Sequence, residues 1–200
     1  MKKVLSLILA LMLAMSLFTC ALGEIKMETY THPVLGFTIQ APADWLQLDS
    51  QNIATLMNDP SIANSFPNVD ISTYVDQCVS NEMTMFLNLY GGNFNIVSEY
   101  IGGAYSASQL VSLLMPALRD QYAQIFGVVD FIVEGDTIKL GNNEYAYLVY
   151  ALGDTVGAQY AICESGRIYY LTLTTTSAIN TLEYIEIEKM FEKVLESFAE

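Results

Sequence analysis

Apolar and polar residues alternate along short segments near the start of the chain, and this pattern predicts strands. Residues 37–40, Phe-Thr-Ile-Gln, alternate as the half-buried strand of a sheet does. Residues 27–31 precede them across a turn that contains Pro33 and Gly36. Because Pro and Gly favour turns between strands, the two segments predict a β-hairpin.

The second half of the chain is dominated by apolar and aromatic runs separated by short turns. Residues 83–90 and 94–100 lie on either side of Gly91-Gly92-Asn93, which predicts a second hairpin. Gly135-Asp136, Gly141-Asn142 and Ser165-Gly166 are turn signals between further predicted strands at residues 128–134, 137–140, 144–152, 159–164 and 167–175. Since these turns are short, the strands are expected to form an antiparallel meander.

Two longer segments repeat apolar residues at helical spacing. The first begins at a cap formed by Ser106 or Ser108 and ends near Gly127, with Pro116 expected to kink its middle. The second, residues 181–199, places the following apolar side chains on one face: Ile187, Met190, Phe191, Val194, Leu195 and Phe198. Its glutamates fall largely on the other faces, so this helix is expected to lie on the sheet.

Shorter helices are expected between the two hairpins. Asp49 or Ser50 can cap a segment that reaches Met57, and Asn68 or Asp70 can start one that runs through Cys78. No internal repeat or long Pro-rich or Gly-rich linker divides the chain. The pattern as a whole predicts one α+β domain over residues 24–200.

Residues 1–23 have the features of a secretory signal peptide. Lys2 and Lys3 precede an apolar run that is shorter than the roughly 20 residues of a spanning helix, and small residues follow. We expect cleavage after Gly23, which predicts a protein that is secreted or held at the cell envelope, with no stable membrane insertion after cleavage. The alternative is a lipoprotein anchored at Cys20, although Phe18 and Thr19 stand where lipoprotein signals prefer small residues.

Acidic residues far outnumber basic ones in the expected mature chain. The leader holds two of the eight basic residues and none of the 22 acidic ones, which leaves a formal charge of −16. Nucleic acid is therefore an unsuitable partner, because binding it requires clustered Lys and Arg. The acidity suits solubility outside the cell, and a role in attracting cations is the alternative.

Two cysteines remain after cleavage, Cys78 and Cys163, in no C-x-x-C arrangement. In an exported protein they could form one disulfide bond, which would stabilise the fold by roughly 4 kcal/mol if unstrained. Two free buried thiols are the equal alternative. The pairing depends on whether a helix and a strand bring the side chains together.

Motifs for catalysis, metal binding and cofactor binding are absent from the sequence, so we predict no enzyme, metal or cofactor. The single histidine, His32, lies in the turn before Pro33 and is interpreted as a surface residue. Asp44 and Asp49 flank Trp45 and could form the carboxylate pair of a glycosidase. We expect them instead to cap a turn and a helix.

Tyrosine is abundant, with 13 in the chain, and six of them fall on adjacent predicted strands. Tyr145 and Tyr147 share one face by the period of two, whereas Tyr169 and Tyr170 point to opposite faces. Tyr145, Tyr147 and Tyr169 are therefore a candidate aromatic contact surface for a sugar or a protein. The alternative is ordinary strand composition beneath covering helices.

The two ends of the mature chain carry a pair of apolar motifs, Phe37-x-Ile39-x-x-Pro42-x-x-Trp45 and Phe191-x-x-Val194-Leu195-x-Ser197-Phe198. Together they resemble the PsbP-like superfamily, which includes many bacterial exported proteins. The resemblance implies an antiparallel sheet packed between helices, in an αβα arrangement. It also places Trp45 and Phe198 in one core, but it does not imply a specific activity.

Two functional hypotheses from different classes follow. The first is a noncatalytic binding or accessory module of the bacterial cell envelope, with an unknown protein or carbohydrate partner. The second is an extracellular hydrolase with an unrecognised acidic site, which requires a cleft holding two carboxylates about 5 to 10 Å apart.

Overall fold

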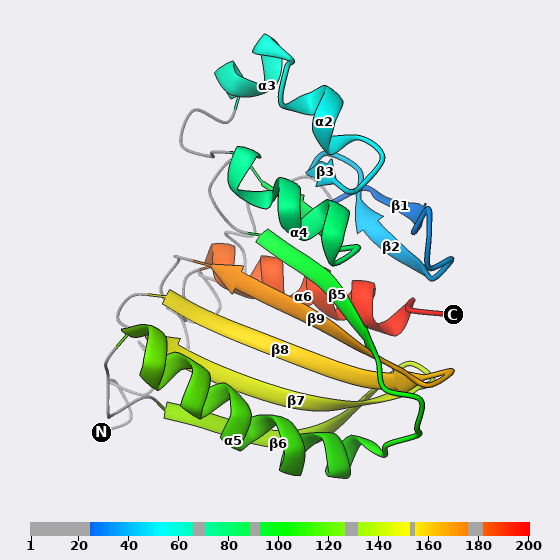
Figure 1. The fold of residues 1–200 in the computed structure, drawn as a ribbon, viewed down its shortest axis with the longest axis vertical. Helices are drawn as coiled ribbons and strands as arrows, with labels where there is room; N and C mark the ends of the chain where they lie inside the picture. The colour runs from blue at the N-terminus through cyan, green and yellow to red at the C-terminus, as the bar shows by residue number, and fades with distance from the viewer. Residues whose placement is uncertain (1–24, 66–70, 89–92, 127–131, 153–154, 176–181) are drawn as a thin grey trace, which may run out of the picture.

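The computed structural model describes residues 25–65, 71–88, 93–126, 132–152, 155–175 and 182–200 (Figure 1). The expected cleavage site after Gly23 and the alternative anchor at Cys20 lie outside these residues. Gly127, where the long helix is expected to end, and Asn68 and Asp70 also lie outside them.

The described strands form two antiparallel sheets. The smaller is a ribbon of two strands, and the larger has seven strands in the order β3-β4-β5-β9-β8-β7-β6. The strand bounds are β1 Met27–Thr31, β2 Thr38–Pro42, β3 Leu46–Leu48, β4 Thr84–Leu87, β5 Asn93–Tyr100, β6 Ile132–Leu140, β7 Asn143–Leu152, β8 Thr155–Glu164 and β9 Arg167–Thr175. Every described pairing is antiparallel, which confirms the strand pairing of both predicted hairpins and the meander of β6 to β9. Of the turn predicted for the second hairpin, Gly91 and Gly92 lie outside the described residues, and Asn93 belongs to β5.

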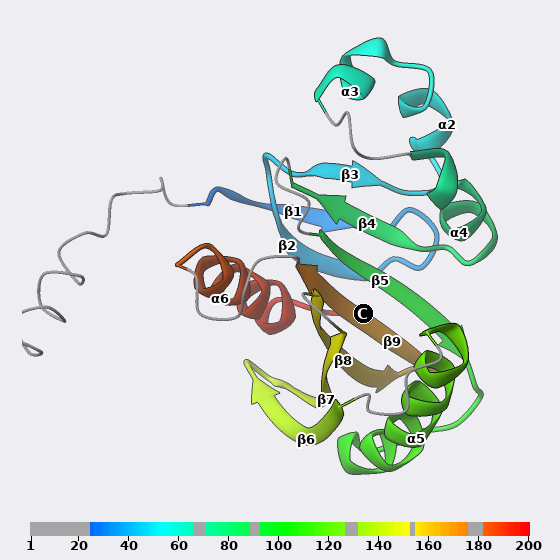
Figure 2. The same cartoon turned by 90° about the vertical axis from the view of Figure 1, so that its left-hand side faces the viewer.

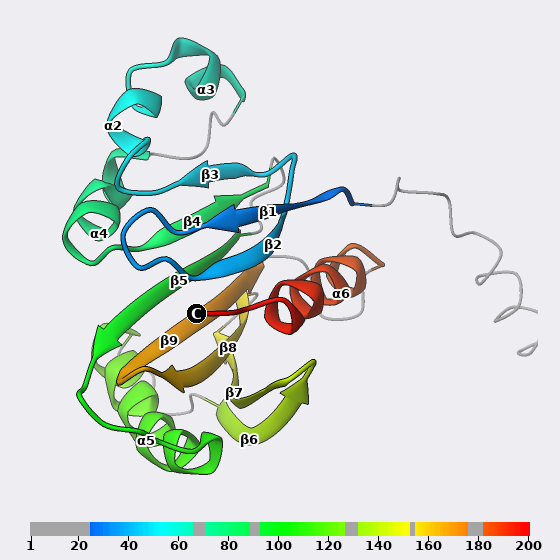
Figure 3. The ribbon, with the colours of Figure 1, turned by 90° about the vertical axis from the view of Figure 1, so that its right-hand side faces the viewer.

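Helices cover both faces of the large sheet, which confirms the αβα arrangement (Figure 2). Helix α6 (Leu182–Glu196) lies on one face together with the β1–β2 ribbon (Figure 3). Helix α5 (Ala107–Phe126) lies on the opposite face. The short helices between β3 and β4 are α2 (Ile53–Leu56), α3 (Pro60–Ser65), the 3₁₀ helix η1 (Ile71–Tyr74) and α4 (Val75–Ser80).

The largest buried cluster lies between α6, the ribbon and the large sheet. It contains both Phe37 and Phe198, whose rings are 5.7 Å apart, and Trp45 packs against it. Backbone hydrogen bonds of 2.7 and 3.0 Å also join Thr38 to Ala199. The prediction that Trp45 and Phe198 share one core is confirmed, because the two ends of the chain pack on the same face of the sheet.

Helix α5 begins at the capping residue that the sequence predicts. The Ser106 hydroxyl accepts a hydrogen bond from the Gln109 N–H, and the Gln109 side chain accepts one from the Ser106 N–H. This reciprocal pair is a capping box, which satisfies backbone donors that a helix start leaves free. Pro116 lies inside the helix, and its side chain is exposed.

The predicted turn at Gly135-Asp136 is wrong, because β6 continues through both residues. Gly135 stands opposite Leu148 in β7, where α5 packs on the sheet. A Cβ atom at Gly135 would lie 2.7 Å from Leu148 Cδ2 and 3.2 Å from Val111 Cγ1. The glycine therefore marks a close approach of the helix to the strand rather than a chain reversal.

Candidate functional site

The predicted tyrosine contact surface is wrong, because α6 covers that face of the sheet. Tyr145 and Tyr169 are 0% exposed, and both belong to the cluster beneath α6. Tyr147 is half-buried, with its ring 4.8 Å from that of Tyr160. The strand period of two correctly placed Tyr145 and Tyr147 on one face, but that face is covered by α6 and is not exposed to solvent.

The two cysteines are free thiols in the structure, so the suggested disulfide bond between them is not formed. Cys78 is buried in α4 beside Met83 and Met85, on the apolar side of the short helices. Cys163 lies in β8 beneath α5, where its thiol is 3.5 Å from the Gly103 carbonyl oxygen. The two residues thus pack in different clusters. Of the alternative, two free buried thiols, the free state holds for both residues, but only Cys78 is buried and Cys163 is partly exposed.

The interpretation of His32 as a surface residue is also wrong, since only 2% of it is exposed. Its ring lies 4.9 Å from the ring of Phe37 at the closed end of the β1–β2 hairpin. The turn folds over the imidazole: Gly36 N–H donates to the His32 carbonyl, and His32 N–H donates to Phe37. A polar residue in a turn is buried here because the following apolar residues draw the turn onto the core.

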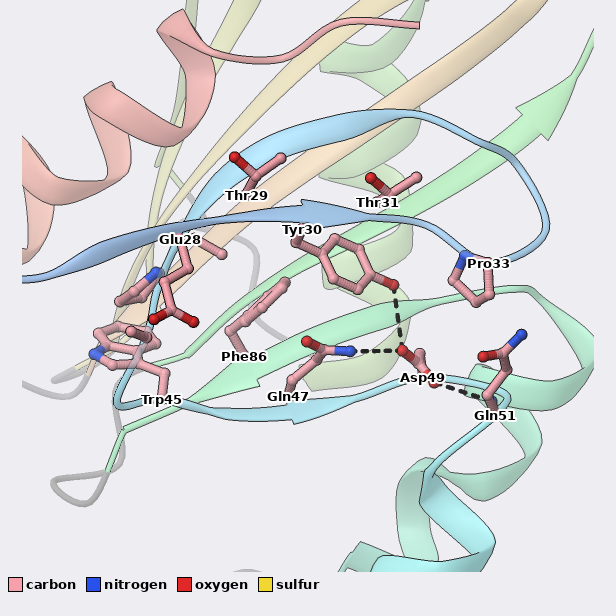
Figure 4. Close-up of a pocket in the computed structure, with 13 residues that line it drawn as sticks. Glu28, Thr29, Tyr30, Thr31, Pro33, Trp45, Gln47, Asp49, Gln51 and Phe86 are labelled. Carbon is pink, nitrogen blue, oxygen red and sulfur yellow. Dashed lines mark hydrogen bonds between the residues drawn. The ribbon is translucent and has the colours of Figure 1, made fainter.

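A hollow of about 280 Å³ opens between strand β1 of the ribbon and strand β3 at the edge of the large sheet (Figure 4). We call it the ribbon pocket. Its polar lining consists of the Tyr30 hydroxyl, amides from Gln47 and Gln51, and carboxylates from Glu28 and Asp49. Thr29 and Thr31 border the pocket, but their side chains lie on the other face of β1 (Figure 4). Trp45 and Phe86 supply aromatic surface, and the described lining contains no Lys or Arg.

Asp49 anchors the polar network at one end of the ribbon pocket. Its Oδ1 accepts hydrogen bonds from the backbone N–H groups of Gln51 and Asn52, at 2.9 and 3.1 Å. Asp49 therefore caps the turn that leads into α2, whereas the N-cap of α2 itself is Asn52, which makes no side-chain capping bond. Asp44 is exposed and does not line the pocket, so the two do not form a carboxylate pair there.

The other carboxylate oxygen of Asp49 orients two side chains that face the pocket. Its Oδ2 accepts from Gln47 Nε2 at 2.7 Å and from the Tyr30 hydroxyl at 3.3 Å. The Tyr30 hydroxyl also lies 2.9 Å from Thr84 Oγ1, and burial raises the pKa of Tyr30. With its nitrogen held by Asp49, the Gln47 amide points its oxygen toward the interior of the pocket (Figure 4).

Charge at the opposite end of the ribbon pocket is partly balanced. Glu28 lies near Trp45 (Figure 4), and its carboxylate accepts a 2.6 Å hydrogen bond from the Lys26 ammonium group. Both side chains of this ion pair are exposed, so solvent screens it. Among the described residues, no group of three or more His, Cys, Asp or Glu side chains could hold a metal ion.

The sequence pointed to Asp49 and Trp45 but not to the other residues of this site. Tyr30 lies on the inward face of β1. The sequence does not show which other element packs against that face. Gln47 carries no motif. What brings them together is the docking of the ribbon beside β3, which leaves a gap between two strands that are not hydrogen-bonded to each other.

Comparison with known proteins supports the fold. No protein-family model matches the chain, and no curated protein matches it. The solution structure of cyanobacterial PsbP (CyanoP) from Synechocystis sp. PCC 6803 matches with a TM-score of 0.51 at 16% identity, over 92% of this chain and 98% of that one. The chain thus has a PsbP-like α+β fold.

A second solved structure, from Bacteroides thetaiotaomicron VPI-5482, matches with a TM-score of 0.41 at 12% identity. The match covers 82% of this chain and 44% of the other one.

In the described part of this chain, none of the helices combines the length and the apolar character that a membrane crossing requires.

Proposed function

We propose that the protein is an exported, noncatalytic binding module of the bacterial cell envelope, and that the ribbon pocket is its ligand site. The observation that carries the proposal is the composition of the pocket: a hydroxyl, two amides, two aromatic side chains and two carboxylates, with no basic residue in the described lining. Such a lining disfavours anions and suits an uncharged, polyhydroxylated ligand, for which Trp45 provides apolar contact and the amides provide hydrogen bonds.

The volume of the pocket supports a small ligand. Pockets for drug-sized ligands span roughly 300 to 1,000 Å³, and the ribbon pocket lies just below that range at about 280 Å³. One or two sugar rings, or the exposed end of a longer glycan, are the ligands that this volume favours. The proposed ligand class is therefore a mono- or disaccharide unit.

The polar groups near the pocket already have hydrogen-bond partners within the protein, which supports a binding role over a catalytic one. A general base or nucleophile needs a free lone pair directed at the substrate. Both carboxylate oxygens of Asp49 accept hydrogen bonds from the protein, and both ring nitrogens of His32 have protein partners. Glu28 is less constrained, because the bond that its Oε1 accepts from the Lys26 ammonium group belongs to an exposed ion pair.

The hydrolase alternative retains one supporting observation, because Glu28 and Asp49 line the same pocket. Hydrolysis would require one of them to exchange its protein partners for substrate. Release of reducing ends from an oligosaccharide, abolished by Asp49→Asn but not by Asp44→Asn, would favour the hydrolase over the binding module.

Trp45 is the only tryptophan in the chain and lines the pocket, so its fluorescence reports on binding there. Titration with neutral saccharides should shift the emission of the mature protein and give a saturable curve. Gln51→Ala should weaken binding by about fivefold, as expected for the loss of roughly 1 kcal/mol from one hydrogen bond. An unchanged spectrum across the saccharide panel would exclude this ligand class.

Gln77→Ala is the matched control for the fluorescence titration. Gln77 is an exposed glutamine in α4 outside the pocket, so its loss should leave binding unchanged. If both variants weaken binding equally, the ligand binds elsewhere on the molecule.

Export is tested separately from binding. Intact-mass measurement on protein from the native host should give a chain that begins at Glu24 and carries no lipid. The variant Cys20→Ser should be exported and released as the wild type is. Accumulation of uncleaved Cys20→Ser, or an acyl chain on Cys20 in the wild type, would establish the lipoprotein alternative.

A further inference from the structure

The imidazole of His32 stabilises the turn of the β1–β2 hairpin by hydrogen bonds to the backbone of that turn. Its Nδ1 accepts hydrogen bonds from the backbone N–H groups of Val34 and Leu35, at 3.2 and 2.9 Å. Since Nδ1 accepts, the proton of the neutral ring is on Nε2, which donates to the carbonyl oxygen of Glu82 at 3.0 Å. The ring therefore links the turn to the residues that lead into β4.

The turn that His32 holds is part of the ribbon pocket. Thr31 and Pro33, the residues on either side of His32 in the chain, both line the pocket. Glu82 has a positive φ of 52°, a conformation that non-glycine residues adopt rarely, so its backbone is constrained where it accepts the Nε2 proton. Movement of the imidazole would therefore affect the pocket rim and the start of β4 together.

We propose that His32 is an acid-sensitive latch: when Nδ1 takes up a proton from solvent, it can no longer accept the Val34 and Leu35 N–H groups, and the hairpin turn opens at the pocket rim. Protonation replaces two attractive contacts with three donors facing one another. The Nε2 bond to Glu82 survives protonation, so the opening is confined to the turn side of the ring.

The surroundings of His32 favour the neutral ring. Burial lowers the pKa of His32, and the Glu82 carbonyl and the charges of Asp49 and Glu82 oppose this effect. Tyr30 is the other titratable side chain against the ring, with ring centroids 6.4 Å apart. Because the folded pKa lies below the unfolded value of about 6.5, the stabilisation is complete above that pH and is lost as pH falls through the folded pKa.

The experiment follows two signals from one sample of the mature wild-type protein between about pH 7.5 and pH 4.5. NMR of the His32 ring gives its titration curve, and amide exchange gives the protection factors of Val34 and Leu35. The two protection factors should fall along the His32 curve, by up to about tenfold for each unit by which the folded pKa lies below 6.5. Amides inside β8 and β9 should keep their protection.

Two variants separate the latch from other acid effects. His32→Asn keeps a side-chain acceptor for the turn but does not titrate, so its Val34 and Leu35 protection should not change with pH. Glu188→Gln removes a carboxyl in α6 whose pKa is raised by burial and by Glu192, and it should behave as the wild type does.

Constant protection of Val34 and Leu35 while the His32 ring titrates would overturn the proposal. The same loss of protection in His32→Asn would overturn it as well. If His32→Asn does not fold, the wild-type protein alone tests the proposal. The proposal stands if the protection factors of Val34 and Leu35 follow the His32 titration curve, and it fails if they do not. Saccharide binding does not enter these measurements, so the latch and the proposed ligand class can fail independently.

Discussion

The hydroxyl of Tyr145 donates a 2.7 Å hydrogen bond to the carbonyl oxygen of Leu195. This bond joins β7 to the last turn of α6, where helix carbonyls lack partners within the helix. It also explains why a tyrosine, rather than a phenylalanine, is fully buried at this position: the polar end of the side chain satisfies the helix end.

Tyr145→Phe should lower the free energy of unfolding by about 0.5 to 1.5 kcal/mol, because it removes this hydrogen bond while the Phe198 N–H, 3.3 Å from the Leu195 carbonyl oxygen, remains as a donor. Urea denaturation followed by circular dichroism measures the change. Tyr100→Phe is the control: Tyr100 is 68% exposed, and the same change there should stay within about 0.5 kcal/mol. Equal effects at both positions would contradict the role assigned to the bond.

Phe198→Ala should destabilise the fold by about 3 to 5 kcal/mol, since the ring is buried among Phe37 and Tyr169. The denaturant midpoint is the measurement. Leu113→Ala, at an exposed position of α5, should leave that midpoint nearly unchanged. A midpoint unaffected by Phe198→Ala would show that the C-terminal motif is not part of the core.

Gly141→Ala should cost more stability than Gly36→Ala, although both glycines have positive φ, 59° and 76°. The backbone strain of about 1 to 2 kcal/mol is common to the two sites. At Gly141 a Cβ atom would also lie 2.9 Å from the Glu196 carbonyl oxygen, whereas nothing lies within 4 Å at Gly36. Thermal unfolding of both variants tests this, and equal costs would contradict a close approach of α6.

Cys78 and Cys163 should differ in reactivity in native protein produced as residues 24–200. Burial, with a contribution from the Asp49 charge, raises the pKa of Cys78 to about 11. Cys163 is partly exposed, so a thiol reagent at neutral pH should label Cys163 first and Cys78 only on unfolding. Cys163→Ser should abolish the early reaction. A wild-type protein with no titratable thiol after denaturation would instead indicate a disulfide.

Alkaline pH should unfold the protein as its buried tyrosines ionise. Burial raises the pKa values of Tyr30, Tyr145 and Tyr160. Because the folded pKa values lie above the unfolded value of about 10, the stabilisation is complete below pH 10 and is lost as pH rises beyond it. Tyrosinate absorbance should therefore rise in a late step that coincides with loss of circular dichroism, and a single early step would contradict burial.

Much of the architecture could be predicted from local sequence patterns. Apolar and aromatic runs between turn signals located the strands that became β5 and β7 to β9, and the apolar face of residues 181–199 marked α6 as a helix on the sheet. Ser106 as a helix cap was also predictable, because a capping side chain bonds backbone groups within three residues of itself. For the same reason Asp49 was recognised as a capping residue, but it caps the turn before α2 and not the helix.

Exposure and long-range partners were decided only by the tertiary structure. Whether Tyr145 and Tyr169 faced solvent depended on where α6 packs, and whether Gly135 formed a turn depended on α5. The burial of His32 depended on Glu82, which lies 50 residues away in the chain. Sequence periodicity defines which residues share a face, but the packing of distant elements determines which face is covered and which gap between strands becomes a pocket.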